Sequence, residues 1–170
     1  AIAGRTTNGV NRTRFGEGLV AYCDPALRPE RRTSDRLLVS SCGVRCRIMS
    51  ADVPESFRGP NFGWGWPDEL AHWRRLKQAW KQFKFTHRIA SPGHHPRAFI
   101  TTTPLGLPDV IELAWQCSEG QPVKAPPGTP PERMFDGYLV NPLTRIIAGS
   151  SYDNVSNLST EFLRDTIAPY

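Results

Sequence analysis

The chain has 170 residues, enough for one compact domain with a hydrophobic core and too few for two ordinary domains joined by a linker. Its apolar fraction of 39% and mean hydropathy of -0.42 exclude an integral membrane protein, since no segment approaches the roughly 18 apolar residues of a membrane-spanning helix. The 21 Lys and Arg exceed the 16 Asp and Glu, and the net charge of +5 favours a polyanionic partner such as nucleic acid.

The first elements predicted along the chain are short strands. Residues 18–22 form an apolar patch that fits the end of either a helix or a strand. Residues 37–39 are apolar, and in residues 44–49 the side chains of Val44, Cys46 and Ile48 alternate with arginines. Such alternation is typical of a half-buried strand.

Helical periodicity begins after residue 68. Apolar side chains recur at spacings of three and four over residues 68–85, which predicts an amphipathic helix or a pair of helices. The β-branched run 97–103 predicts a strand that ends at Pro104, and Pro108 followed by Asp109 predicts the start of a short helix.

Loops and short elements are predicted for the remainder. Residues 118–133 are rich in proline and predict a loop, residues 138–148 predict one or two strands, and residues 156–167 predict a helix. Strands and helices alternate from residue 44 onward, so the sequence predicts an α/β layered sheet in one domain.

Asp68 and Glu69 are the first candidates for chemistry, because they precede a predicted helix and follow an aromatic segment. At the end of a strand, one acid can hold the Mg²⁺ that bridges nucleotide phosphates, and a second acid can polarise the attacking water. Adjacent acids at a helix N-terminus more often complement the helix dipole. The glycines at 63 and 65 also make the preceding segment a poor strand.

Thr101, Thr102 and Thr103 are the second candidate, since a strand here presents hydroxyl groups at its tip. Such hydroxyls can bond a phosphate or a catalytic water, although a Thr-rich strand that ends in a turn is the more frequent case. A phosphate loop of the pattern Gly-x-x-x-x-Gly-Lys-Ser/Thr is absent, and the nearest segment, residues 4–13, lacks the Gly-Lys pair.

Several segments occur in one order along the chain: Phe57-Arg-Gly-Pro-Asn-Phe62, Asp68-Glu-Leu-Ala-His-Trp73, Ile100-Thr-Thr-Thr-Pro104 and Gly149-Ser-Ser-Tyr-Asp-Asn154. This series resembles the ATPase domain of the large terminase subunits of tailed phages and prophages, over about residues 43–170. The resemblance implies a three-layer P-loop NTPase-like sheet with flanking helices, and ATP-driven packaging of double-stranded viral DNA into the capsid.

The resemblance also implies roles for individual residues. Asp68 resembles the Walker B ligand of Mg²⁺, Glu69 the catalytic carboxylate, and residues 101–103 the motif that couples hydrolysis to DNA movement. Arg58 is a candidate phosphate sensor.

The family's phosphate loop aligns with residues 11–16, which places Arg12 where the family has lysine and Thr13 at the nucleotide and its Mg²⁺. Arg12 and Asn11 depart from the family's Lys and Gly, and both changes alter how a backbone loop cradles phosphate. The segment before residue 43 is also shorter than in the family. We therefore expect a degenerate or rearranged phosphate-loop region in residues 1–42, with the sheet incomplete on that side.

ATP and Mg²⁺ are the implied ligands, and the implied partners are double-stranded DNA, the capsid portal, the small terminase subunit and copies of the chain in a ring. The location would be the host cytoplasm, with no membrane association. We expect no nuclease domain within residues 1–170, because no acidic cluster follows the ATPase motifs.

Two alternatives stay open. One is a decayed, hydrolysis-deficient prophage fragment that at most binds DNA or nucleotide. The other is a basic α/β protein that binds nucleic acid through Trp, Arg and Lys side chains of the helical region 68–85, without any nucleotide.

Overall fold

The computed structural model describes residues 2–4, 23–32, 34–90, 92–103, 107–150, 153, 156, 159, 160 and 164. The chain divides into two compact units, Ala1–Val110 and Ile111–Tyr170. The expectation of one ATPase-like domain over residues 1–170 stays a prediction.

The described part of the first unit contains one mixed sheet and short helices. Its strands are β1 (Ile2–Gly4), β2 (Glu30–Arg32), β3 (Leu37–Val39), β4 (Arg45–Ser50), β5 (Trp64–Pro67) and β6 (Arg97–Ala98). Its helices are the 3-10 turns η1 (Pro54–Phe57) and η2 (Leu70–His72) and the α-helix α3 (Leu76–Thr86). Helix α4 (Pro108–Ala114) begins in this unit and ends in the second.

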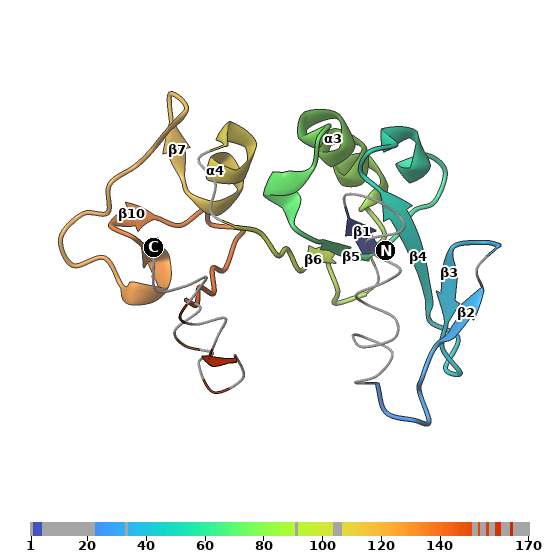
Figure 1. Cartoon of the computed structure of the whole chain (residues 1–170). Coiled ribbons are helices and arrows are strands. Elements are labelled where there is room, and N and C mark those ends of the chain that lie inside the picture. Colours follow the sequence, from blue (N-terminus) through green and yellow to red (C-terminus); the bar gives the residue numbers. More distant parts are fainter. Residues whose placement is uncertain are drawn as a thin grey trace. The chain divides into compact units, whose positions relative to one another are not determined.

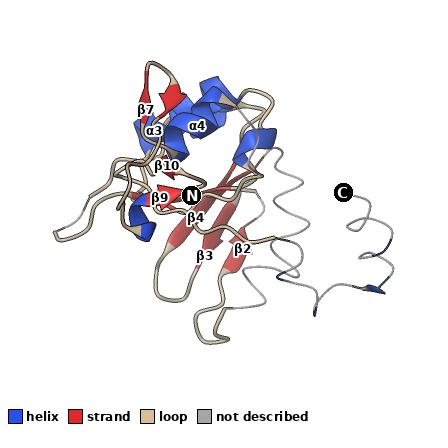
Figure 2. Ribbon diagram, turned by 90° about the vertical axis from the view of Figure 1, so that its left-hand side faces the viewer, coloured by secondary structure: helices blue, strands red, loops and turns tan. Residues whose placement is uncertain are grey.

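The sheet has the strand order β2-β3-β4-β1-β5-β6 (Figure 1). β1 pairs in parallel with both β4 and β5, so that Ala3 lies opposite Met49 on one side and Pro67 on the other. β5 and β6 are also parallel, whereas β2, β3 and β4 form an antiparallel meander and lie side by side in Figure 2. The carboxyl ends of β4, β1, β5 and β6 therefore lie along one edge of the sheet.

Helix α3 packs its apolar stripe against the rest of the first unit. Leu76, Ala79, Trp80, Phe83 and Thr86 are buried, at the spacing of three and four that marks one helix face. The ring of Phe83 stacks on Trp80 with centroids 5.1 Å apart, and it also contacts the rings of Phe57 and Phe62 at 6.3 and 5.4 Å. This aromatic cluster is the centre of the core.

Gly65 allows α3 to approach β5. A Cβ on residue 65 would lie 2.4 Å from Cζ of Phe83, which is closer than any side chain atom can stand. Gly65 lowers the strand propensity of this segment, but its missing side chain leaves the space that the Phe83 ring occupies.

A second apolar contact lies on the β3–β4 hairpin. Leu38 and Ile48 are 1% and 3% exposed, and the partly buried side chains of Cys46 and Trp66 pack against them. Arg45 and Arg47 alternate with these residues along β4 and are exposed. The predicted alternation is thus confirmed over residues 45–48, whereas Val44 is exposed and Met49 is buried next to Ile48.

Among the described residues, the second unit contains two small hairpins and a 3-10 turn. The strands are β7 (Cys117–Ser118) with β8 (Gln121–Pro122), and β9 (Met134–Phe135) with β10 (Tyr138–Leu139), and the turn is η3 (Pro131–Arg133). Glu119-Gly120 and Asp136-Gly137 have positive φ at both positions, as a tight two-residue hairpin turn requires. Side chains of Asn141 and Thr144 donate to the carbonyls of Glu112 and Leu113 and so satisfy the end of α4.

Several predictions from the sequence are confirmed and others are corrected. The strands at 37–39 and 44–49 and the helix at 108–114 are present. The strand predicted at 97–103 is assigned only over Arg97–Ala98, although the amides of Phe99 and Thr101 continue its hydrogen bonds to β5. Of the strands predicted at 138–148, β10 covers two residues. The patch 18–22 lies outside the described residues, as does most of the helix predicted at 156–167.

The helical region 68–85 contains a pair of helices, η2 and α3, which are separated by Trp73, Arg74 and Arg75. Glu69 has φ 49 and ψ 47, a left-handed conformation that a right-handed helix cannot contain. η2 follows it, and α3 begins at Leu76. Leu70 and Trp73 are buried, as the apolar periodicity predicted, and of the two predicted alternatives, one helix or a pair, the pair is present.

No helix in the described part of the chain combines the length and the apolar character that crossing a bilayer requires.

The packing of α3 predicts a large difference between two phenylalanines of the same helix. Phe83 is 1% exposed and Phe85 is 60% exposed. We expect Phe83→Ala to lower the free energy of unfolding by about 3–5 kcal/mol and Phe85→Ala to change it by less than about 0.5 kcal/mol. Urea unfolding of the two variants measures the difference, and equal losses would contradict this position of α3.

Candidate functional site

Asp68 and Glu69 follow β5 directly, at the edge where the parallel strands end. The amide of Asp68 donates to the carbonyl of Ala3 at 2.8 Å, which continues the pairing of β5 with β1. The amide of Thr101 donates to the carbonyl of Pro67 at 3.1 Å, which continues the pairing with β6. Two neighbouring strands therefore fix the backbone at the acids from both sides.

The hydroxyl of Thr101 links the two acids. It donates to Oδ1 of Asp68 at 2.5 Å, and it lies 3.4 Å from both the backbone amide of Glu69 and Nε1 of Trp66. A hydroxyl has one hydrogen to donate and can accept from both N–H groups. Thr101 therefore fixes one oxygen of the Asp68 carboxylate and at the same time holds the backbone of Glu69.

The next two residues of the turn are held by the same segment. The amide of Leu70 donates to the carbonyl of Thr101 at 3.1 Å, and the amide of Ala71 donates to Oγ1 of Thr102 at 3.0 Å. These are the first amides of η2, which have no acceptor inside the turn. Thr101 and Thr102 thus satisfy three consecutive amides, those of residues 69, 70 and 71.

The two acids have different environments. Asp68 is 8% exposed, and its carbonyl accepts a hydrogen bond from Nε1 of Trp73 at 2.9 Å. Glu69 is exposed, and its left-handed backbone turns the chain away from β5. A carboxylate and a hydroxyl in contact form a hard oxygen donor set of the kind that Mg²⁺ prefers, so Asp68 fits a Mg²⁺ ligand.

The structure brings together Asp68, Glu69, Thr101 and Thr102 among the predicted site residues. Thr103 is exposed and contributes its carbonyl, which accepts from the hydroxyl of Thr102 at 3.1 Å. Arg58 is exposed at the end of η1, where its amide donates to the carbonyl of Glu55 at 3.0 Å. Arg12 and Thr13 lie outside the described residues.

The threonines and the acids contact each other, which neither a plain strand end nor a helix N-terminus would require. The threonines do end a strand, but two of their side chains bond the turn that carries the acids. The acids are not at the N-terminus of α3, which begins at Leu76, and Glu69 makes no side-chain cap of η2. The pair instead precedes the 3-10 turn η2, whose N-cap residue is Glu69.

Sequence reasoning missed Asp52. It lies two residues beyond the end of β4, at the same edge of the sheet as Asp68, and its Oδ1 is buried without a hydrogen-bond partner in the described part of the chain. A buried carboxylate oxygen without a donor is costly. In the sequence, the feature that points to Asp52 is an acid two residues after the end of an apolar strand.

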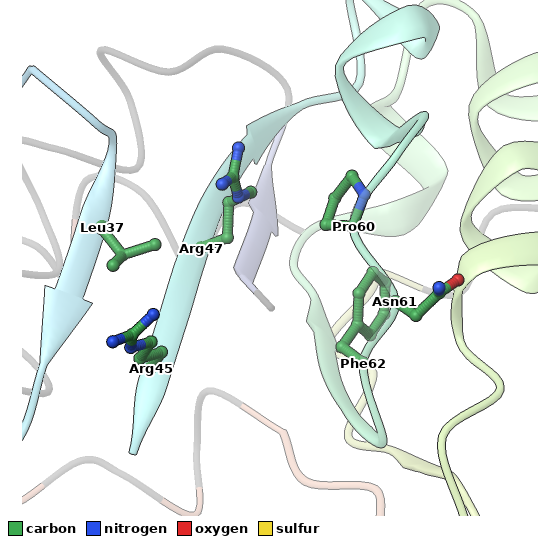
Figure 3. A pocket seen from close by; sticks show the side chains of 6 residues that line it. All are labelled: Leu37, Arg45, Arg47, Pro60, Asn61 and Phe62. Atoms are coloured by element: carbon green, nitrogen blue, oxygen red, sulfur yellow. The ribbon is translucent and has the colours of Figure 1, made fainter. Parts of the chain in front are cut away.

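A separate basic pocket lies on the sheet (Figure 3). Leu37, Arg45, Arg47, Pro60, Asn61 and Phe62 line it, and Arg45 and Arg47 project from the same face of β4. It contains none of the acids or threonines of the candidate site.

Comparisons with known proteins identify relatives of the chain. The family model described as the terminase large subunit, T4likevirus-type, N-terminal, matches residues 1–160. No curated protein matches the chain. The ATPase domain of the large terminase of Thermus phage P74-26 is similar with a TM-score of 0.41 and 19% identity, over 69% of this chain and 54% of that chain. A point mutant of that domain is similar at 18% identity with the same TM-score of 0.41 and the same coverage of 69% and 54%. The chain thus spans about half of the length of these terminase structures.

Because the backbone of Glu69 is left-handed, a glycine at this position should make the protein more stable than an alanine would. Left-handed geometry costs a residue with a side chain about 1–2 kcal/mol, whereas glycine adopts it freely and loses about 0.5–1 kcal/mol more in chain entropy. We expect Glu69→Gly to raise the free energy of unfolding by about 0.5–1 kcal/mol over Glu69→Ala. Thermal or urea unfolding of the two variants tests this, and a less stable glycine variant would show that residue 69 is not left-handed.

Proposed function

We propose, from the premise that this chain belongs to the T4-like family of terminase large subunit N-terminal regions, that it forms the ATPase part of a motor that packages double-stranded viral DNA. The observation that carries the proposal is the contact of the Thr101 hydroxyl with both Asp68 and the backbone of Glu69. It joins a buried carboxylate, a hydroxyl and the backbone of an exposed glutamate at the carboxyl edge of parallel strands. Ligands of open α/β sheets bind outside this edge.

Asp68 would hold Mg²⁺, with Thr13 as a second oxygen ligand. When bound, the ion supplies positive charge that offsets the charge on the β- and γ-phosphates of ATP. The Thr101 hydroxyl fixes Oδ1 of Asp68, and the side chain is 8% exposed, so the carboxylate is oriented before any ligand arrives. Because the side chain is already ordered, binding loses little additional conformational entropy at this residue.

Glu69 would act on the attacking water. Its carboxylate is exposed and adjacent to Asp68, so it can orient a water molecule and accept its proton. Three amides from residue 69 onward are held by Thr101 and Thr102, which limits the movement of the Glu69 backbone.

Residues 101–103 would couple hydrolysis to movement. Thr101 contacts the proposed Mg²⁺ ligand through its hydroxyl and the turn after Glu69 through its carbonyl. A change in the hydrogen bonds of Asp68 is thereby passed to a segment that leads in sequence to α4. In this proposal, these contacts would be the route by which the state of the nucleotide reaches another element.

The phosphate-binding part of the proposal rests on residues 1–42. We assign Arg12 to the phosphates, within a three-layer P-loop type of fold whose phosphate loop is degenerate, and we keep Arg58 as a phosphate sensor. β1 ends beside Asp68, so the chain that continues from Gly4 starts at the proposed site.

The proposed partners are those of a packaging motor: duplex DNA, the capsid portal, the small terminase subunit and further copies of the chain in a ring, in the host cytoplasm. The second candidate function is a decayed, hydrolysis-deficient relative that binds DNA or nucleotide at most. Asn11 and Arg12, at the positions of glycine and lysine, favour this alternative.

Hydrolysis of Mg-ATP tests the two functions. We expect the parent chain to turn over ATP and Glu69→Gln to lower kcat by at least about 100-fold, since the amide cannot accept a proton. Glu55→Gln is the matched control, because Glu55 is also an exposed glutamate of the first unit, and its kcat should stay within about twofold. Thr101→Val should weaken Mg-ATP binding, whereas Thr101→Ser should retain it.

The outcomes separate the assignments. Turnover that persists in Glu69→Gln would show that Glu69 is not the general base. Binding that appears only in Arg12→Lys would establish a decayed phosphate loop at that position. Turnover that is insensitive to Arg12→Ala would place the phosphate-binding cation elsewhere, and binding absent from every variant would leave only the second candidate function.

A further inference from the structure

Three lysines form a narrow stripe on α3. Lys77, Lys81 and Lys84 are exposed and are spaced by four and three residues. At about 100° per residue they lie within roughly 60° of one another, and the 1.5 Å rise separates them by about 6 and 4.5 Å along the axis. This stripe is called the lysine face below.

The helix provides nothing to balance this charge. α3 contains no Asp or Glu, and in the described part of the chain these three ammonium groups take part in no ion pair. Like charges at spacings of three and four residues destabilise a helix by a few tenths of a kcal/mol per pair. The lysine face therefore does not contribute to the stability of the fold.

Aromatic side chains border the lysine face on both sides. Trp80 and Phe85 flank it on the helix surface, and the ammonium of Lys81 lies 6.0 Å from the centroid of the Phe85 ring. Phe85 is 60% exposed, although a large apolar side chain in that position gains nothing from the core. A hollow of about 540 Å³ lies at this surface and is lined by Lys77, Trp80, Lys81, Lys84, Phe85 and Asp109.

We propose that the lysine face of α3 contacts the phosphate backbone of duplex DNA. A row of unpaired cations fits a partner whose negative charges repeat along a line, which a small anion does not offer. Lysine ammonium groups are point charges without the planar fork that reads guanine, so they position DNA without reading its sequence. Contact independent of sequence is what a protein that moves along DNA requires. The inference rests on the proposed function only in the choice of DNA as the polyanion.

The arginines of the sheet provide the matched control surface. Arg32 and Arg47 lie in one cross-strand row with Leu37, and Arg45 lies two residues along on the same face, in a row with Val39 and Glu30. Their surface thus carries the same number of cations as the lysine face, and each surface has one carboxylate beside it, Glu30 in the row of Arg45 and Asp109 in the hollow at the lysines. In Figure 3, Arg45 and Arg47 lie between Leu37 on one side and Pro60 on the other.

The test compares two triple variants with equal change in net charge, Lys77→Gln/Lys81→Gln/Lys84→Gln and Arg32→Gln/Arg45→Gln/Arg47→Gln. Fluorescence anisotropy with a labelled duplex of about 30 base pairs and mixed sequence gives Kd over a series of KCl concentrations, without nucleotide. Each lost phosphate contact lowers the slope of log Kd against log salt by about 0.9. We expect the lysine triple to lower the slope by about 2–3 and to weaken binding at least about tenfold, and the arginine triple to weaken it less than about threefold.

Each outcome decides the proposal. Equal losses in the two triples would mean that net charge alone attracts DNA, and a larger loss in the arginine triple would place the contact on the sheet; either result overturns the proposal. No binding by the parent chain also overturns it, even if ATP is hydrolysed. A selective loss in the lysine triple supports it, even if ATP is never hydrolysed. Thermal unfolding of both triples confirms that each variant is folded.

Discussion

Parallel pairing of β1, β5 and β6 is the constraint on which the rest of the structure depends. In parallel pairing all three strands end at the same edge, so two segments about thirty residues apart, at Asp68 and Thr101, leave the sheet side by side. Every hydrogen bond of the candidate site follows from this arrangement. The Thr101 hydroxyl reaches both acids because the ladder between Pro67 and Thr101 is already formed. The strand register therefore brings the residues of the site together, and their side chains then form the hydrogen bonds between them.

The same strand connects the site to the core. β5 lies under α3 at Gly65, where the Phe83 ring takes the space of a missing side chain, and four residues later the chain adopts the left-handed turn at Glu69. A strand so closely covered on one face has little freedom to shift. β5 is thus packed closely at Gly65 and is followed by a left-handed turn at Glu69. Both features hold Asp68 and Glu69 in fixed positions, as a ligand-binding role would require.

Local patterns in the sequence predicted individual strands and helices, but they did not predict features that depend on residues far apart in the chain. Alternation in residues 44–49 and the proline at 108 act within one element, so the strand and the helix were predictable. The resemblance in the ordered motifs identified the family, which the match over residues 1–160 confirms. The left-handed Glu69, the buried oxygen of Asp52 and the role of Gly65 depend on residues far away in sequence, and no local pattern encodes them. The roles assigned to the site residues all stay predictions: those of Arg12, Thr13, Arg58, Asp68, Glu69 and residues 101–103.

The central position of β1 has a consequence for how the chain folds. Residues 2–4 leave the ribosome before the strands they pair with, which are residues 48–50 and 66–67. Contacts between residues so far apart close slowly, because a long loop must be ordered before any hydrogen bond is gained. Until β4 and β5 have been synthesised, β1 is an unpaired strand with both edges open, which is the state most prone to join other chains. A chaperone that holds the nascent chain would therefore raise the yield of folded protein more than stabilising the helices would.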